Sequence, residues 1–273
     1  MNRLGIELLS FHGLPVLDQV SLAARLGCAH ISCGLTQLPE AFNPLGHPDW
    51  SLRDDPQLRR EMLAALRDNA VSISLGEGFG IRPQINVAER ERDVDIMAEL
   101  GVRGLGAVCM EPDNARAIAE LALLSEMAAT RGMLVTIEFG PGLAIANCRQ
   151  ALEALRAVDM PNFKLLIDSM HFFRSGGTLE EIAALDPPLI GYAQLCDVPL
   201  TSALPNYMEE AMNARLAPGS GKLPLAEFVA LLPRDIPIGL EVPNIALASA
   251  MADPAERLQP AVTAARDLLK LGE

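Results

Sequence analysis

The chain has 273 residues, 50% of them hydrophobic, which is enough for one large buried core. Its formal net charge of -13 argues against a nucleic-acid partner, because phosphates are bound by basic footprints and no long Lys/Arg cluster occurs. No uncharged apolar run approaches the roughly 18 residues that span a bilayer. No secretory signal precedes the first predicted strand, and the five cysteines are scattered without a C-x-x-C pair. We therefore expect a cytoplasmic protein with reduced thiols that binds neither membranes nor nucleic acids.

Apolar runs of strand length alternate with segments of helical periodicity along the chain. The predicted strands span residues 3–9, 30–33, 71–75, 104–110, 134–138, 165–168, 190–194 and 236–241. The predicted helices span residues 18–26, 56–69, 86–100, 114–131, 144–158, 178–185, 224–232 and 254–271, with a further short helix over 206–213. A long connection over residues 34–55 follows the second strand, and long loops in compact domains tend to be functional.

The alternation of strands and helices indicates the fold. Strands separated by helices pair in parallel through crossover connections, and eight such units close into a (β/α)8 TIM barrel. The competing architecture is a doubly wound open sheet, which typically has fewer strands and carries a nucleotide-binding signature that is missing here. We predict an α/β fold with a single TIM barrel domain over residues 1–273.

Four successive strands end in a polar side chain: Glu138, Asp168, Gln194 and Glu241. In a barrel of parallel strands, these carboxyl ends form the rim at which ligands bind. Carboxylates at apolar strand ends are costly unless they are paired or bound to metal, and three of them at one rim would repel each other. Any single one could instead cap a loop or pair with Arg or Lys, but the joint pattern predicts one divalent cation. Because the ligands would all be oxygen atoms, Mn²⁺ or Mg²⁺ fits better than Zn²⁺.

Two glycine-rich stretches do not indicate nucleotide binding. Residues 76–80, GEGFG, lack the G-x-G-x-x-G spacing and do not open a helix at once. Residues 219–222, GSGK, resemble part of a phosphate-binding loop, but Leu216 stands where its first glycine belongs and Leu223 where Ser or Thr should hold magnesium.

With the strand-end residues, several motifs give the chain a likeness to a known family. It resembles the sugar-phosphate isomerase/epimerase superfamily of xylose isomerase-like TIM barrels, which includes ketose 3-epimerases, inosose-processing enzymes and dehydroshikimate dehydratases. The likeness covers essentially the whole chain and rests on Ile137-Glu138, Asp168-Ser-Met-His171, Gln194-Leu-Cys-Asp197, Arg215-Leu-Ala-Pro-Gly-Ser-Gly221 and Gly239-Leu-Glu241.

The resemblance implies roles for six of these residues. Glu138, Asp168, Gln194 and Glu241 would be the metal ligands, Glu138 and Glu241 would also form the acid/base pair, and His171 and Arg215 would bind substrate. The chain departs from the family pattern at Gln194, where the family usually has His, and at Ser220, where it usually has an acidic residue.

Other residues are ambiguous from sequence. His171 alone could cap a helix, and Arg215 could pair on the surface with Glu209 or Glu210, at little gain in stability. Its alternative is a guanidinium fork on a substrate carboxylate, hydroxyl or phosphate. His12 and Trp50 follow the first and second strands and are expected to line the substrate pocket, although Trp50 could simply anchor its loop.

Three functions follow as hypotheses. The first is a metal-dependent isomerase or epimerase of a sugar, keto-sugar or cyclitol, in which proton transfer occurs next to a metal-polarised carbonyl. The second is a metal-dependent dehydratase, a lyase, of a cyclic hydroxy acid such as dehydroshikimate. The third is a barrel that binds metal or ligand without turnover. In the two enzyme cases the partner is a small polyhydroxy or hydroxy-acid substrate, and a homo-oligomer is compatible with the composition.

Overall fold

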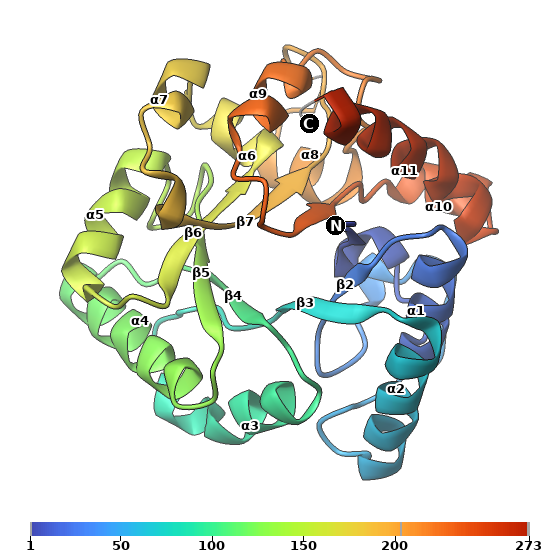
Figure 1. The fold of residues 1–273 in the computed structure, drawn as a ribbon, viewed down its shortest axis with the longest axis horizontal. Helices are drawn as coiled ribbons and strands as arrows, with labels where there is room; N and C mark the ends of the chain where they lie inside the picture. Colours follow the sequence, from blue (N-terminus) through green and yellow to red (C-terminus); the bar gives the residue numbers. More distant parts are fainter. Residues whose placement is uncertain (1, 203, 272–273) are drawn as a thin grey trace.

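The structure is a computed structural model that describes residues 2–202 and 204–271. Eight parallel strands form a closed barrel in chain order. They are β1 (Leu4–Ile6), β2 (His30–Cys33), β3 (Ser72–Gly76), β4 (Gly104–Val108), β5 (Leu134–Glu138), β6 (Phe163–Asp168), β7 (Ile190–Leu195) and β8 (Ile238–Leu240). β1 closes the ring by pairing with β8, with Leu4 opposite Ile238 and Ile6 opposite Leu240. The predicted TIM barrel is therefore confirmed (Figure 1).

Helices surround this barrel (Figure 1). They are α1 (Val16–Arg25), α2 (Pro56–Asn69), α3 (Glu91–Glu99), α4 (Asn114–Ala129), α5 (Cys148–Val158), α6 (Ser169–Arg174), α7 (Leu179–Ala183), α8 (Tyr207–Asn213), α9 (Leu225–Leu231), α10 (Ile245–Ala250) and α11 (Pro254–Leu271). Short 3-10 helices lie at η1 (Leu8–Phe11), η2 (Glu40–Phe42), η3 (Val87–Arg90) and η4 (Pro187–Leu189). Several helices begin at side-chain caps, as at Asp55 before α2 and Asp113 before α4.

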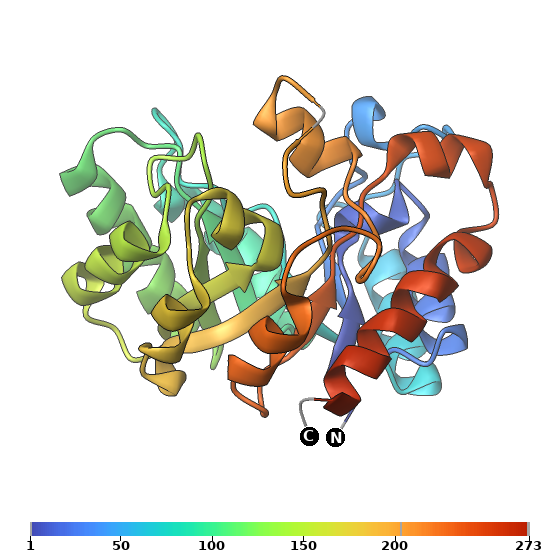
Figure 2. The ribbon, with the colours of Figure 1, turned by 90° about the horizontal axis from the view of Figure 1, so that it is seen from above.

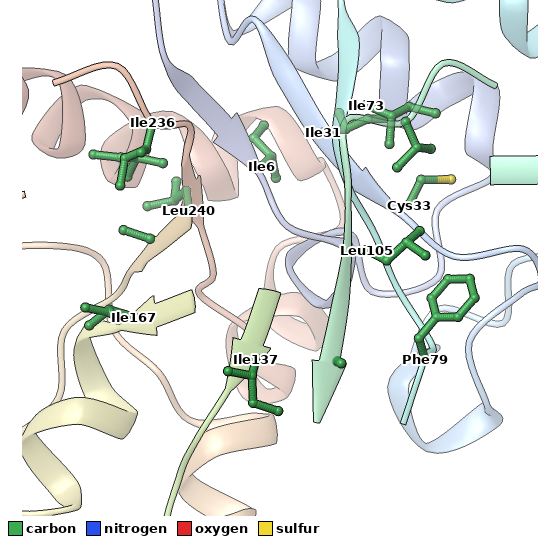
Figure 3. Packing of buried hydrophobic residues seen from close by; sticks show 14 of the residues in the cluster. Ile6, Ile31, Cys33, Ile73, Phe79, Leu105, Ile137, Ile167, Ile236 and Leu240 are labelled. Carbon is green, nitrogen blue, oxygen red and sulfur yellow. The ribbon is translucent and has the colours of Figure 1, made fainter. Parts of the chain in front are cut away.

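The core explains why the strands read as continuous apolar runs. Ile6, Ile31, Ile137, Ile167 and Leu240 have no exposed surface and belong to one hydrophobic cluster (Figure 3). A strand inside a ring of helices is covered on both faces, so its residues do not alternate in polarity. Each fully buried aliphatic side chain of this kind contributes about 1.5–3 kcal/mol to folding.

The structure differs from the predicted elements in a few places. β1 ends at Ile6 and not at residue 9, because the chain turns into η1, where the amide N–H of Leu8 donates to Ser32 Oγ at 2.7 Å. Helices α6 and α10 were not predicted, since each has only six residues and no apolar period of useful length. The short helix predicted over residues 206–213 is present as α8.

Two further expectations concern the surface and the thiols. Within residues 2–202 and 204–271, every helix is too short or too polar to cross a bilayer. All five cysteines are buried and none is in a disulfide.

Figure 2 shows α8, in orange, and α10, in red, projecting at the same end of the barrel.

Candidate metal centre

The four strand-end residues lie at one rim of the barrel. Glu138 and Asp168 are the last residues of β5 and β6, Gln194 lies in β7, and Glu241 follows β8 directly. The strand register aligns them, because Asp168 is paired with Gln194, and Gln194 with Gly239. Parallel pairing thus brings together side chains that are about a hundred positions apart in sequence.

Glu138, His171 and Glu241 form the tightest group of potential ligands. One ligand atom from each lies within 4.8 Å of the others. His171 Nε2 is 3.2 Å from Glu138 Oε1, and the two side chains are only 11% and 18% exposed. His171 belongs to α6, whose N-cap is Asp168: its Oδ1 accepts the amide N–H of His171 at 2.8 Å. The D-x-x-H spacing therefore works through a helix cap, which fixes the imidazole beside the carboxylates.

Arg215 is buried among the acidic residues and is not on the surface. Its Nη1 donates to Asp168 Oδ2 at 2.7 Å and lies 2.9 Å from Glu241 Oε2. Nη2 lies 3.1 Å from His171 Nε2, and Nε donates to the Ala211 carbonyl at 2.6 Å. The guanidinium is thus an internal counter-ion, and the surface pairing with Glu209 or Glu210 does not occur. Burial alone would raise the pKa of Asp168, but Arg215 and His171 outweigh it and hold that pKa below its usual value.

Gln194 carries an unsatisfied oxygen. Its Nε2 donates to Glu7 Oε2 at 3.1 Å, whereas its Oε1 is buried without a hydrogen-bond partner among the described residues. A buried carbonyl oxygen without a donor costs roughly 1–3 kcal/mol. That oxygen is a suitable ligand for a hard cation.

Two further carboxyl groups beneath the rim escaped prediction. Glu7 is fully buried and accepts a hydrogen bond from the Tyr192 hydroxyl at 2.7 Å, while Ser74 Oγ lies 2.9 Å from that hydroxyl. Burial raises the pKa of Glu7, although the hydrogen bonds from Tyr192 and Gln194 lower it in part. Burial also raises the pKa of Glu77, and the charge of Glu7 adds to it. Both residues directly follow a strand, β1 and β3, so the same strand-end signal could have found them.

The charge balance at this rim tests whether a metal fits. The guanidinium of Arg215 pairs with Asp168 and Glu241. Three further carboxyl groups, those of Glu138, Glu7 and Glu77, add to the acidic charge at the rim. Burial raises the pKa of Glu241, and the guanidinium of Arg215 lowers it. The charges of Glu138 and Asp168 raise it further, so that this pKa lies well above the ordinary value of a glutamate. Repulsion among these carboxylates therefore exceeds what Arg215 neutralises. The carboxylates, the imidazole and the orphaned amide oxygen fit a divalent cation in both charge and donor type.

Helix α8 packs against this group. The Tyr207 hydroxyl hydrogen-bonds His171 Nδ1. α8 is held in turn by Glu210, whose two oxygens accept from Arg174 at 2.9 and 3.0 Å. The imidazole is thereby contacted on one nitrogen by Tyr207 and on the other by Glu138 and Arg215.

The departure at Ser220 has a structural explanation. Asp197 Oδ1 accepts the amide N–H groups of Val198 and Leu223 at 2.9 and 3.0 Å, and Oδ2 accepts that of Gly219 at 3.0 Å. The loop that follows Arg215 is therefore folded around Asp197. Ser220 is exposed on this loop, and the loop does not need an acidic residue there to hold its shape.

His12 and Trp50 lie outside the Glu138–His171–Glu241 group. His12 is 2% exposed, and its Nε2 accepts the amide N–H of Asn244 at 3.2 Å. Asn244 Nδ2 donates to the Arg215 carbonyl at 3.2 Å, so that asparagine links His12 to the rim. Trp50 packs against the core, and its Nε1 is buried without a hydrogen-bond partner among the described residues. A contact of either residue with substrate stays a prediction.

Comparison with known proteins adds relatives of known activity. The chain is 33% identical over 153 residues to a 3-dehydroshikimate dehydratase of Pseudomonas aeruginosa, a match of 53% of this chain but 24% of that protein. It is 28% identical over 189 residues to a 3-dehydroshikimate dehydratase of Pseudomonas putida, covering 64% of this chain and 29% of that protein. The matched part is therefore less than a third of either relative.

Solved structures share the fold. The crystal structure of the IOLI protein with a bound zinc atom superposes with a TM-score of 0.79 at 18% identity, over 98% of both chains. A D-psicose 3-epimerase crystallised with D-fructose gives a TM-score of 0.71 at 14% identity, over 98% of this chain and 99% of the other. A family model described as xylose isomerase-like TIM barrel matches residues 20–268, which is most of the chain. The chain is therefore a member of the xylose isomerase-like TIM barrel family.

Proposed function

We propose that the chain is a divalent-metal-dependent dehydratase of a cyclic hydroxy acid such as 3-dehydroshikimate. The observation that carries this proposal is the cluster of Glu138, His171 and Glu241 at the barrel rim. The choice of a lyase is supported by the two related 3-dehydroshikimate dehydratases. A sequence-based interpretation as an isomerase or epimerase has weaker support, because the epimerase shares only the fold.

Glu138, Asp168, Gln194 and Glu241 would hold the cation, with His171 beside them. A divalent ion there would polarise a substrate carbonyl and acidify the neighbouring C–H. Oxygen donors dominate this set, so we propose Mn²⁺ or Mg²⁺, although an imidazole within reach is also compatible with zinc. Metal analysis of the purified protein distinguishes these ions.

The side chains supply the proton transfers. One of the carboxylates Glu138 and Glu241 takes the proton from the carbon next to the carbonyl, and the electron pair of that C–H bond forms a C=C bond. The bond between the neighbouring carbon and its hydroxyl oxygen breaks, and the hydroxyl receives a proton from the other carboxyl and leaves as water. The ring of 3-dehydroshikimate then tautomerises to the aromatic 3,4-dihydroxybenzoate. His171, 3.2 Å from Glu138 Oε1 and backed by Tyr207, keeps Glu138 oriented.

The test is ultraviolet absorbance of the aromatic product, with Mn²⁺-loaded protein and 3-dehydroshikimate. We expect Glu138→Gln and Glu241→Gln each to lower kcat by about 10²–10⁴-fold, while Glu153→Gln, on the exposed face of α5, leaves it unchanged. An absent signal with every cyclic hydroxy acid would overturn the dehydratase.

Two alternatives have their own measurements. An isomerase or epimerase would exchange substrate protons with solvent deuterium on a ketose panel without forming an aromatic product. A barrel that only binds metal would take up the ion stoichiometrically and show neither signal.

A further inference from the structure

Arg215 is not free to clamp a substrate carboxylate. Nε donates to the Ala211 carbonyl, Nη1 donates to Asp168 Oδ2 and to Cys196 Sγ, and Nη2 is 3.1 Å from His171 Nε2. Glu241 is also held in an ion pair with Nη1 at 2.9 Å. A guanidinium has five N–H donors, so one remains. A bidentate contact with a substrate carboxylate, the geometry that favours arginine for this role, therefore has to come from another residue.

A cavity of about 350 Å³ lies at the barrel mouth between the loops that follow β2 and β3. Its wall includes Glu77, Arg53, Arg82 and Arg90. Glu77 links this cavity to the metal centre, because it lines the cavity and directly follows β3, at the same end of the barrel as Glu138 at the end of β5 and Glu241 after β8. The cavity volume is at the lower end of the range for small-molecule sites.

The cavity wall is basic, although the whole chain has a net charge of -13. Arg53 and Arg90 share one carboxylate: Arg53 donates to both oxygens of Asp93 at 2.7 and 2.9 Å, and Arg90 Nε donates to Oδ2 at 2.6 Å. Arg90 also lies 5.1 Å from the centre of the Phe79 ring. Asp93 thus serves both arginines, and the charge of Asp54 also acts on Arg53.

Arg82 is exposed, and its guanidinium has no partner within residues 2–202 and 204–271. Its backbone is nevertheless fixed, because Ile81 makes a parallel bridge with Cys109 beyond the end of β4. Arg116 donates to the Arg82 carbonyl at 3.1 Å and to the Ile85 carbonyl at 2.7 Å. The loop therefore presents Arg82 at the cavity from a fixed backbone, which lowers the entropy lost on binding.

Gly80 makes room for this arginine. A Cβ at Gly80 would lie 3.1 Å from Arg82 Nε, so the side chain lies close over the glycine. Both residues line the cavity.

We infer that this cavity binds the carboxylate of the substrate, with Arg82 as the main contact and the Asp93-bound Arg53 and Arg90 in the same wall. A ring held there by its carboxylate would direct its oxygens past Glu77 toward Glu138 and Glu241. This inference rests on the proposed function for the identity of the substrate, but it concerns a separate set of residues.

The test measures how much the Mn²⁺-loaded protein prefers an acid over its carboxylate-free analogue. Isothermal titration with 3,4-dihydroxybenzoate and with catechol gives this ratio, since both share the ring diol. A charge-assisted contact of about 1.5–3 kcal/mol corresponds to a ratio of about ten- to hundredfold. Arg82→Ala should remove most of that ratio without weakening catechol binding, Arg82→Lys should keep part of it, and Arg67→Ala, which removes an exposed arginine of α2, should keep all of it.

Each outcome decides the assignment. If Arg82→Ala keeps the wild-type preference, or if the wild-type protein has no preference for the acid, the inferred subsite is wrong. If the preference depends on Arg82 but 3-dehydroshikimate yields no aromatic product, the subsite stands and the dehydratase fails. If the product forms, and Arg82→Ala leaves KM unchanged, the dehydratase stands and the subsite fails.

Discussion

Arg215 shows what one buried charge does at this site. It pairs with Asp168 and Glu241 at 2.7 and 2.9 Å, and its side chain is only 1% exposed. We expect Arg215→Leu, which removes the positive charge, to lower the free energy of unfolding of the metal-free protein by about 3–5 kcal/mol, because two carboxylates are left buried without it. Urea denaturation measures this.

A second substitution checks the cause. Arg215→Leu combined with Glu241→Gln should be less destabilised than the sum of the two single variants, since one of the unpaired charges is gone. A loss below about 1 kcal/mol in the single variant would show that the pairs contribute little.

His12 predicts a dependence of stability on acid pH. Burial, and then the charge of Arg257, lower the pKa of His12 to about 4, whereas an unfolded histidine titrates near 6.5. The unfolded state therefore binds the proton first as pH falls. The resulting stability is fully present above about pH 6.5 and is lost as pH falls toward 4, by roughly 3 kcal/mol.

The measurement compares free energies of unfolding of the wild-type protein and His12→Gln between pH 7 and pH 4. The difference between the two free energies should change over this range, because only the wild-type protein contains His12. The contribution of His30, whose pKa is also lowered, is present in both proteins and cancels. A constant difference would mean that His12 does not titrate as inferred.

At the scale of elements, β8 is adapted to Glu7. A Cβ on Gly239 would overlap the Glu7 carboxylate, so the strand needs a glycine at this position. Gly239→Ala should destabilise the protein by about 1–3 kcal/mol, the range for overpacked cores. In a double-mutant cycle, Glu7→Ala should recover part of this loss, whereas additive effects would rule out the steric cause.

The strands were predictable from sequence, whereas short elements were not. The sequence located the strands Leu134–Glu138 and His30–Cys33 at the right residues, and residues 135–137 and 30–33 within them are buried. The apolar Leu8 and Leu9 extended the predicted first strand too far, because the turn at η1 depends on the hydrogen bond that the Leu8 amide donates to Ser32, a residue distant in sequence. The six-residue α6 lacks a periodic pattern, and its start is set by the cap at Asp168.

The residues of the candidate metal centre were only partly predictable from sequence. Strand ends predicted that Glu138 and Glu241 lie at one rim, because parallel pairing brings strand ends to one edge. The third member of their group is His171, which lies in α6 beyond a strand end. The inward direction of Arg215 depends on α8 and on the strand ends together, which sequence spacing does not specify. Glu7 was missed because it stood inside a strand that was predicted too long.

At the scale of the molecule, a bound cation should stabilise the fold. At a free Mn²⁺ concentration a hundredfold above its Kd, the free energy of unfolding should rise by about 2.7 kcal/mol, and EDTA should reverse this. The Glu138→Gln, Glu241→Gln double variant is the control and should show no rise at the same Mn²⁺ concentration. An equal rise in this variant would place the stabilising ion elsewhere.

The position of Arg215 has a consequence for maturation. Asp168 ends β6 and Glu241 follows β8, on the two sides of β7, and the guanidinium pairs with both. Because a cation built into the chain ties these two strands together, we expect the ring of strands to close with or without a metal. Under the proposed function, metal binding would then follow folding, in contrast to zinc fingers, which stay unfolded until their ion is bound.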